Sequence, residues 1–108
     1  MRTNIFRDYK KGTTFKGGLI DISKNGIAID LVGTKVSLQL KENGKDDIVF
    51  EFSTENDRLS ISNDPPGRII VLPFLIKLPV AEYNTSLILT YSNETVKELF
   101  NRKWKITQ

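Results

Sequence analysis

The sequence predicts an all-β domain, built as an antiparallel β-sandwich of about eight short strands. Turn-forming pairs such as Asn25-Gly26 and Asn43-Gly44 recur at short intervals. The segments between them alternate apolar and polar residues, as half-buried strands do. Outside residues 95–104, no window keeps apolar residues at the helical period of 3.6, so long helices are not expected. A chain of 108 residues suits a single domain, residues 1–108, with a core of its own.

The Asn25-Gly26 pair gives the strongest local signal. Both residues tolerate positive φ, so the pair predicts a tight hairpin between residues 20–22 and 27–31. The odd-numbered positions of the second segment are apolar and are expected to face the core.

The middle of the chain predicts a longer hairpin and a central strand. Residues 36–41 and 48–53 alternate apolar and polar side chains on either side of a polar loop, which indicates two paired strands. A short strand is expected at residues 59–61. Residues 68–72 are apolar on both faces, which is typical of a strand inside a sheet.

Two segments are harder to assign. Prolines bracket residues 73–79, and because proline cannot donate to a β-ladder, we expect a crossover or one short helical turn near residues 73–78. Residues 95–104 carry apolar residues at helical spacing, but residues 103–107 alternate cleanly between basic or polar and apolar side chains. We therefore favour a final strand there, with a short helix leading into it as the alternative.

These elements predict two antiparallel sheets packed face to face, an immunoglobulin-like β-sandwich. Burying each large apolar side chain contributes roughly 1.5–3 kcal/mol, so the core is a main source of stability. The expected core consists of Ile20, Ile22, Ile27, Ile29, Leu31, Val36, Leu38, Leu40, Phe50, Phe52, Leu59, Ile61, Ile69, Val71, Leu87, Leu89, Tyr91, Trp104 and Ile106.

The composition argues against catalysis. The chain has no histidine and no cysteine, which removes the usual general base near neutral pH and the ligands of most zinc sites. Asp46 and Asp47 follow Lys45 in a polar turn, a pattern that a calcium loop does not have. The longest apolar run, residues 69–78, is far short of the ~20 residues that cross a bilayer. We therefore expect no enzyme, no cofactor, no metal site and no membrane partner.

The positive charge is concentrated at the two ends of the chain. The net charge is +3; residues 1–16 hold five basic residues against one acidic residue, and residues 97–108 hold four against one, so the segment between them is acidic. If the first and last strands are neighbours, these ends form a basic patch. Solvated strand faces are the simpler interpretation, and head-to-tail packing of subunits, basic edge against acidic body, is another. The candidate interface residues are Phe6, Tyr9, Lys10, Lys11, Lys103 and Lys105.

Two binding functions compete with such an interface. Exposed aromatic side chains, Tyr9, Tyr83 or Trp104, would suit a carbohydrate- or cell-surface-binding module. Aromatic residues among basic ones, such as Phe6, would suit stacking of single-stranded nucleic acid, which is the less favoured partner. The ordinary interpretation is that Phe6 and Phe15 close one end of the sandwich and that Trp104 belongs to the core.

Several turn-and-strand motifs occur together in one order. They are Gly12-Thr13-Thr14-Phe15, Asp21 to Gly33 with its Asn-Gly turn and its Asp-Leu-Val-Gly ending, Val36 to Lys41, Phe50 to Glu55, Pro79 to Tyr83, and Asn101 to Gln108. This order resembles a family of phage structural domains, the N-terminal β-sandwich domain of the phage baseplate upper protein and related small tail-associated proteins. The likeness covers nearly the whole chain.

The resemblance implies a structural role. Such domains are rigid sandwiches that pack against copies of themselves or against other tail proteins, and they turn over no substrate. It implies a phage or prophage virion protein of the tail or baseplate, with other phage structural proteins as partners and a homo-oligomeric state. Its location would be the virion, after assembly in the cytoplasm of the bacterial host.

Overall fold

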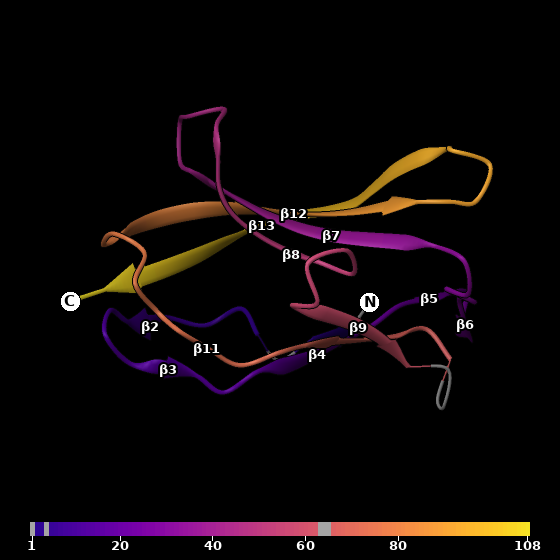
Figure 1. Ribbon diagram of the computed structural model, residues 1–108, viewed down its shortest axis with the longest axis horizontal. Helices are drawn as coiled ribbons and strands as arrows, with labels where there is room; N and C mark the ends of the chain where they lie inside the picture. The colour runs from indigo at the N-terminus through magenta and orange to yellow at the C-terminus, as the bar shows by residue number, and fades with distance from the viewer. Residues whose placement is uncertain (1, 4, 63–65) are drawn as a thin grey trace.

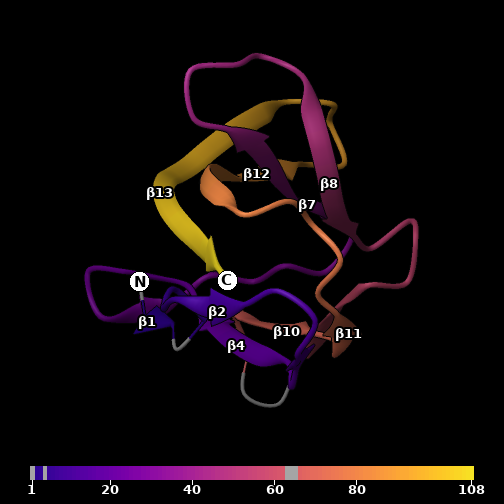
Figure 2. The same cartoon turned by 90° about the vertical axis from the view of Figure 1, so that its left-hand side faces the viewer.

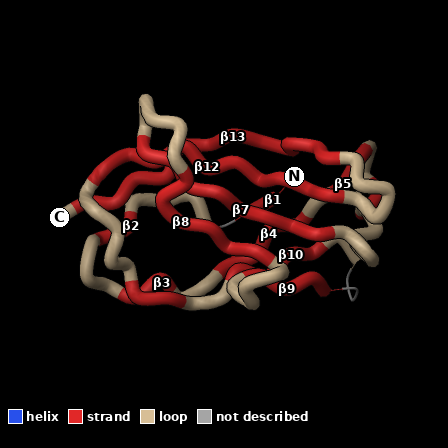
Figure 3. Tube along the Cα trace, turned by 45° about the horizontal axis from the view of Figure 1, so that its top comes forward, coloured by secondary structure: helices blue, strands red, loops and turns tan. Residues whose placement is uncertain are grey.

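The computed structural model describes residues 2–3, 5–62 and 66–108. Every regular element in these residues is a β-strand, and no helix occurs among them (Figure 3). The strands form two main layers that face each other across a hydrophobic core (Figure 1). The all-β prediction is therefore confirmed, with more strands than the eight or so expected.

The first layer is a four-stranded antiparallel sheet in the order β1-β4-β10-β9. Its strands are β1 (Arg2–Thr3), β4 (Gly18–Asp21), β10 (Arg68–Val71) and β9 (Leu59–Ser62). β10 lies between β4 and β9, which confirms the predicted central strand. Its side chains alternate between half-buried and buried, because only one face of this layer covers the core.

The second layer is a five-stranded sheet in the order β2-β13-β12-β7-β8. Its strands are β2 (Tyr9–Lys10), β13 (Val96–Thr107), β12 (Ala81–Thr90), β7 (Lys35–Glu42) and β8 (Ile48–Ser53). The long β12–β13 hairpin forms its centre, with one bulge in the pairing. β13 bends along its length, from its pairing with β12 to its pairing with β2 at the edge of the sheet. The sheet therefore curls over the core (Figure 2).

One strand pairing differs from the purely antiparallel prediction. β2 runs parallel to β13, with Tyr9 opposite Ile106 and Lys10 opposite Thr107. β1 pairs with β4 in the first layer, so the N-terminal segment contributes to both layers. Because the chain crosses from one layer to the other without reversing into a hairpin, β2 meets β13 in parallel.

Residues 73–78 carry the chain from β10 in the first layer to β12 in the second, which is the expected crossover, and they form no helical turn, the other possibility that was predicted. β11 (Phe74–Leu75) pairs antiparallel with β3 (Thr14–Phe15) in a small two-stranded sheet. The amide of Ile76 donates to the carbonyl of Thr13 at 3.0 Å. Proline limits the ladder, but the remaining backbone groups find partners on the β3 segment, so no helical turn is needed to satisfy them.

The contested segment at residues 95–104 is strand from Val96 onwards. β13 begins at Val96, directly after a tight turn in which the amide of Glu94 donates to the carbonyl of Tyr91 at 2.8 Å. The favoured strand is therefore confirmed, and the alternative with a leading helix is wrong.

The turn at Asn25-Gly26 is confirmed by its backbone angles, φ of 54° and 78°. The hairpin around it is shorter than expected, because only β5 (Ser23–Lys24) and β6 (Ile27–Ala28) pair. It forms its own two-stranded sheet at one end of the molecule (Figure 1).

The centre of the core is an aromatic cluster around Trp104. The centroid of its indole lies 5.4 Å from that of Phe15, 5.5 Å from that of Tyr9 and 6.2 Å from that of Phe52. Such aromatic pairs add about 0.5–1.5 kcal/mol each beyond their buried area. The buried apolar residues are Ile5, Phe15, Ile20, Ile22, Leu31, Val36, Leu38, Leu40, Phe52, Leu59, Ile69, Val71, Ile76, Leu78, Tyr83, Leu87, Leu89, Trp104 and Ile106.

The predicted core differs from the observed one mainly at the ends of strands. Ile27 is 73% exposed, so its assignment to the core is wrong; it lies on the separate β5–β6 hairpin, which covers neither layer. The prediction missed Ile5, Ile76 and Leu78, which lie in irregular segments where no alternation marks them. It also left out Phe15 and Tyr83, which lie on β3 and β12. The predicted core residues that are only partly buried are Ile29, Phe50, Ile61 and Tyr91.

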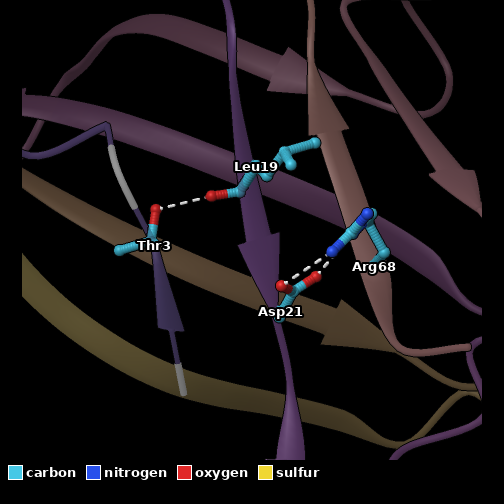
Figure 4. Close-up of polar contacts among 4 residues, drawn as sticks. All are labelled: Thr3, Leu19, Asp21 and Arg68. Atoms are coloured by element: carbon cyan, nitrogen blue, oxygen red, sulfur yellow. Dashed lines mark hydrogen bonds and ion pairs between the residues drawn. The ribbon is translucent and has the colours of Figure 1, made fainter. Parts of the chain in front are cut away.

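An ion pair joins the two central strands of the first layer. Arg68 Nε donates to Asp21 Oδ1 at 2.8 Å, and Arg68 Nη2 donates to Asp21 Oδ2 at 3.2 Å (Figure 4). This hydrogen bonding is the main reason that the pKa of Arg68 lies above its ordinary value. On the other side of β4, Thr3 Oγ1 donates to the carbonyl of Leu19 at 2.8 Å and fastens β1 to the sheet.

Candidate protein interfaces

The structure brings the basic residues of the two chain ends together, as the predicted patch requires. Lys10 on β2 stands opposite Thr107 on β13, and the amide of Lys11 donates to the carbonyl of Thr107 at 2.8 Å. The exposed basic residues on this side are Lys10, Lys11, Lys103 and Lys105.

An acidic residue lies within this patch. Glu82 Oε1 forms an ion pair with Lys103 Nζ at 3.1 Å, and Glu82 lies opposite Lys105 in the β12–β13 register. Asn43 Nδ2 donates to the same carboxylate oxygen at 3.4 Å. The surface is therefore of mixed charge, which suits a protein partner better than a continuous run of phosphates.

Phe6 packs against the edge of the core. Its ring meets Phe100 edge-on at 5.4 Å and Trp104 at 6.0 Å between centroids. The guanidinium of Arg102 lies 4.7 Å from the centroid of the same ring. The ring is thus engaged within the chain, as the ordinary interpretation of Phe6 predicted.

Tyr9 packs its ring against the core and also lines a polar pocket. The ring meets Phe15 edge-on at 5.2 Å. The pocket has a volume of about 400 Å³ and is also lined by Arg7, Thr14 and Lys16. Burial raises the pKa of the Tyr9 phenol, and the charge of Arg7 acts in the opposite direction. Two cations and two hydroxyl groups suit an anionic group of a partner; the sequence marked Arg7 and Lys16 only as part of the basic N-terminal segment.

An apolar pocket of about 410 Å³ lies beside the free edge of β8. Phe50 and Phe74 stack in its wall with centroids 4.9 Å apart, and the guanidinium of Arg58 covers Phe50 at 4.6 Å. Ile48 and Val49, which precede Phe50 on β8, are both exposed. The sequence placed this strand correctly but gave no sign that one side of it borders an apolar pocket.

The C-terminal half of the β8 edge is capped by side chains. Asn56 Nδ2 donates to the carbonyl of Glu51 at 3.0 Å, and Asn56 Oδ1 accepts from the amide of Ser53 at 2.9 Å. The two bonds go to the residues before and after Phe52, which is how a residue of a neighbouring parallel strand would pair with β8. Arg58 also donates to the carbonyl of Glu51, at 3.2 Å. Free edges attract other strands, so this cap limits backbone pairing to the first residues of β8.

A third pocket, which we call the end groove, lies between β13 and the β5–β6 hairpin. Its volume is about 300 Å³, and Lys24 and Lys97 belong to its lining. The remaining wall is largely apolar and includes Ile22, Ile29, Leu99 and Phe100. Neither lysine was singled out by the sequence, because the groove forms only when β13 meets the hairpin.

The part of the chain that the structure describes contains no group of three or more histidine, cysteine, aspartate or glutamate residues that can hold a metal ion. None of its elements is a helix long and apolar enough to cross a membrane. Two buried polar atoms in the described residues, Thr85 Oγ1 and Trp104 Nε1, have no hydrogen-bond partner. Both face the packed interior, where they do not form a site with other polar groups.

Comparison of the sequence with models of protein families finds no match, and comparison with curated proteins finds none either. The fold and the surfaces described above are therefore the basis on which a function is proposed.

Proposed function

We propose that this chain is a non-enzymatic, immunoglobulin-like module of a phage or prophage particle, which acts in the tail or baseplate by packing against other proteins. The observation that carries the proposal is the position of the exposed large apolar side chains. Ile48 and Val49 lie on the edge strand β8, and Leu75 lines the pocket beside it. Ile27 pairs with Lys24 and Val96 directly precedes Lys97, and both lysines line the end groove. The other exposed large apolar side chains of the described residues are Val32, Leu72 and Val80. Exposed apolar side chains next to a pocket are typical of interaction sites.

The strand order supports the immunoglobulin-like part of the proposal. Immunoglobulin domains order their strands A-B-E-D in one sheet and G-F-C in the other, with C′ added in the variable type. The first layer here runs β1-β4-β10-β9, and the second runs β13-β12-β7-β8 with β2 at its edge. Taken in chain order, β1, β4, β7, β8, β9, β10, β12 and β13 then correspond to A, B, C, C′, D, E, F and G.

A local feature at the start of β12 supports the same assignment. The hydroxyl of Tyr83 donates to the carbonyl of Pro79, four residues earlier. Immunoglobulin domains carry a tyrosine at this corner of strand F, bonded to the backbone upstream, and a cysteine two residues later. Thr85 occupies that later position, and since the chain has no cysteine the sandwich does without the disulfide.

The particle itself is proposed from the resemblance of the turn-and-strand motifs to phage baseplate and tail-associated domains. The absence of histidine and cysteine from the sequence fits a protein that works by shape and burial. In this proposal the partners are other phage structural proteins and further copies of the chain. The location is the virion, reached after assembly in the cytoplasm of the bacterial host.

The two alternative functions have less support. Trp104 is 2% exposed and Tyr83 is 1% exposed, so neither can serve as a platform for a sugar ring. The rings of Phe6 and Tyr9 both pack edge-on against Trp104 and are partly buried, so they are engaged with the core and less suited to stacking a base.

The experiment is quantitative mass spectrometry of density-purified particles released from cells that carry the gene. We expect the chain to co-purify with the particles at a constant ratio to their major tail protein. If the chain stays in the soluble lysate and is missing from intact particles, the proposal is wrong.

A further inference from the structure

We infer that copies of this chain associate head to tail, with the acidic loop between β7 and β8 of one copy seated in the end groove of the next. The inference rests on the proposed function, which makes the chain a packing module, and it names one partner as the chain itself. Three observations support it: the residues that line the end groove, the sequence of the loop, and the positions of the two at opposite ends of the molecule.

The end groove is built to receive an apolar segment that carries negative charge. Leu99 and Phe100 of β13 line it from the second layer, and Lys24 and Lys97 lie on its two sides. No ion pair joins either lysine to a carboxylate of the described residues. Ile27, opposite Lys24 in the β5–β6 register, adds exposed apolar surface beside the groove.

The loop after β7 offers the complementary sequence. Asp46 and Asp47 are exposed and form no ion pair with the described residues, and the exposed side chains of Ile48 and Val49 follow directly. Two carboxylates followed by two branched apolar side chains match two lysines around an apolar wall. Such matching of charge steers association and fixes its register.

The loop and the groove of one molecule are too far apart to meet. The amide of Asn43, in the loop, donates to the carbonyl of Glu82 near the start of β12, whereas Thr90 at the end of β12 pairs with Val96 beside the groove. Eight residues of strand at about 3.3 Å each separate these points by about 26 Å. Figure 1 shows the loop rising from one half of the molecule and β5–β6 at the opposite end. The contact must therefore join different copies.

A contact between two different surfaces is heterologous, so it continues from copy to copy until it closes a ring or extends as a filament. The charge distribution favours this arrangement over a symmetric dimer. The ends of the sequence are basic and the segment between them is acidic, so identical patches repel while unlike patches attract.

The test is a charge swap followed by sedimentation velocity from 5 µM to 500 µM protein, concentrations chosen on the order of those at which weak homotypic contacts assemble. The variants are K24E/K97E, D46K/D47K and the quadruple variant that carries all four changes. We expect each double reversal to weaken self-association about tenfold and the quadruple variant to regain most of it, because the reversed loop then matches the reversed groove. Raising the salt concentration should weaken association of the wild type and of the quadruple variant alike.

The matched control is D8K/D57K, which makes the same change of charge as D46K/D47K at two exposed acidic residues outside the loop and outside the groove lining, and should leave the groove contact intact. Circular dichroism melts confirm that every variant is folded. A wild-type chain that stays monomeric at 500 µM, or a quadruple variant no stronger than either double reversal, overturns the inference. Neither result touches the proposed function, which is decided separately by the presence of the chain in purified particles.

Discussion

The phenol of Tyr83 donates a hydrogen bond to the carbonyl oxygen of Pro79, and this bond closes the corner through which the chain enters β12. Tyr83 stands opposite Trp104 in the β12–β13 register, so the corner is tied directly to the centre of the core. Burial is the main reason that the pKa of Tyr83 lies above its ordinary value, and the nearby charge of Glu42 adds to the shift.

Replacing Tyr83 by phenylalanine should lower the free energy of unfolding by about 1–2 kcal/mol. The substitution keeps the ring but leaves the Pro79 carbonyl without its donor, and a net hydrogen bond of this kind contributes about that much. Urea denaturation measures the loss. Tyr91→Phe is the matched control, because the described residues include no hydrogen bond from the Tyr91 hydroxyl; a loss of similar size there would contradict the role of the corner.

Stability should fall in alkaline solution because the two shifted tyrosines hold their protons more tightly in the folded state. The pKa values of Tyr9 and Tyr83 are both raised above the ordinary 10.0. A raised folded-state pKa contributes stability that is fully present below pH 10 and is lost as the pH rises through the folded pKa. Urea midpoints measured between pH 8 and pH 11.5 test this sign, with Tyr83→Phe expected to show a shallower decline above about pH 10. Equal declines in the two proteins would contradict it.

Gly67 should be the least replaceable of the turn glycines. Its φ is +77°, and a Cβ at this position would lie 2.6 Å from the carbonyl oxygen of Ile22. Gly44 has a similar φ of +84°, but a Cβ there would meet nothing within 4 Å. Gly67→Ala and Gly44→Ala therefore share the cost of a left-handed alanine, about 1–2 kcal/mol, and only Gly67→Ala adds a backbone clash of about 1–3 kcal/mol. Thermal unfolding of the two variants measures the clash as the difference between their losses of stability. Equal losses would contradict this prediction, because they would show that the turn at Gly67 relaxes to accept the Cβ.

Removing the cap on β8 should expose its edge. Asn56→Ala deletes the bonds to Glu51 and Ser53 and the one that Asn56 Oδ1 accepts from the amide of Arg58 at 3.1 Å. We expect a loss of about 1–2 kcal/mol and faster aggregation through backbone pairing, which does not depend on salt. Light scattering at matched fractions folded measures the aggregation. Asn93→Ala, which removes one turn bond to the amide of Thr95, should aggregate at the wild-type rate.

The parts of the fold that depend on local pattern were predictable from the sequence. Residues 36–41 and 103–107 alternate without interruption, and both became strands with the expected inward faces. Asn25-Gly26 formed its turn, but the sequence could not show that the hairpin would stand outside both layers and leave Ile27 exposed. The crossover at residues 73–78 was expected, but its pairing with β3 was not, because the backbone partners lie some sixty positions away and no local signal reports such a pairing.

The surfaces were less predictable than the strands. The basic residues did meet, since β2 and β13 are neighbours, but Glu82 from β12 joins them and changes the character of the patch. The end groove brings Lys24 and Lys97 together from opposite halves of the sequence. Neither relationship has a period or a motif, because each depends on how two layers close over one core.

Every proposal above requires that the two layers close over the aromatic cluster, so that only edges and ends remain for contacts with other proteins. The most direct test is a nuclear Overhauser spectrum of the folded chain in solution. The account predicts cross-peaks between the ring protons of Phe15 and Trp104, whose centroids lie 5.4 Å apart, and between the backbones of Tyr9 and Ile106 in parallel register. A well-dispersed spectrum that lacks both sets of cross-peaks would contradict it.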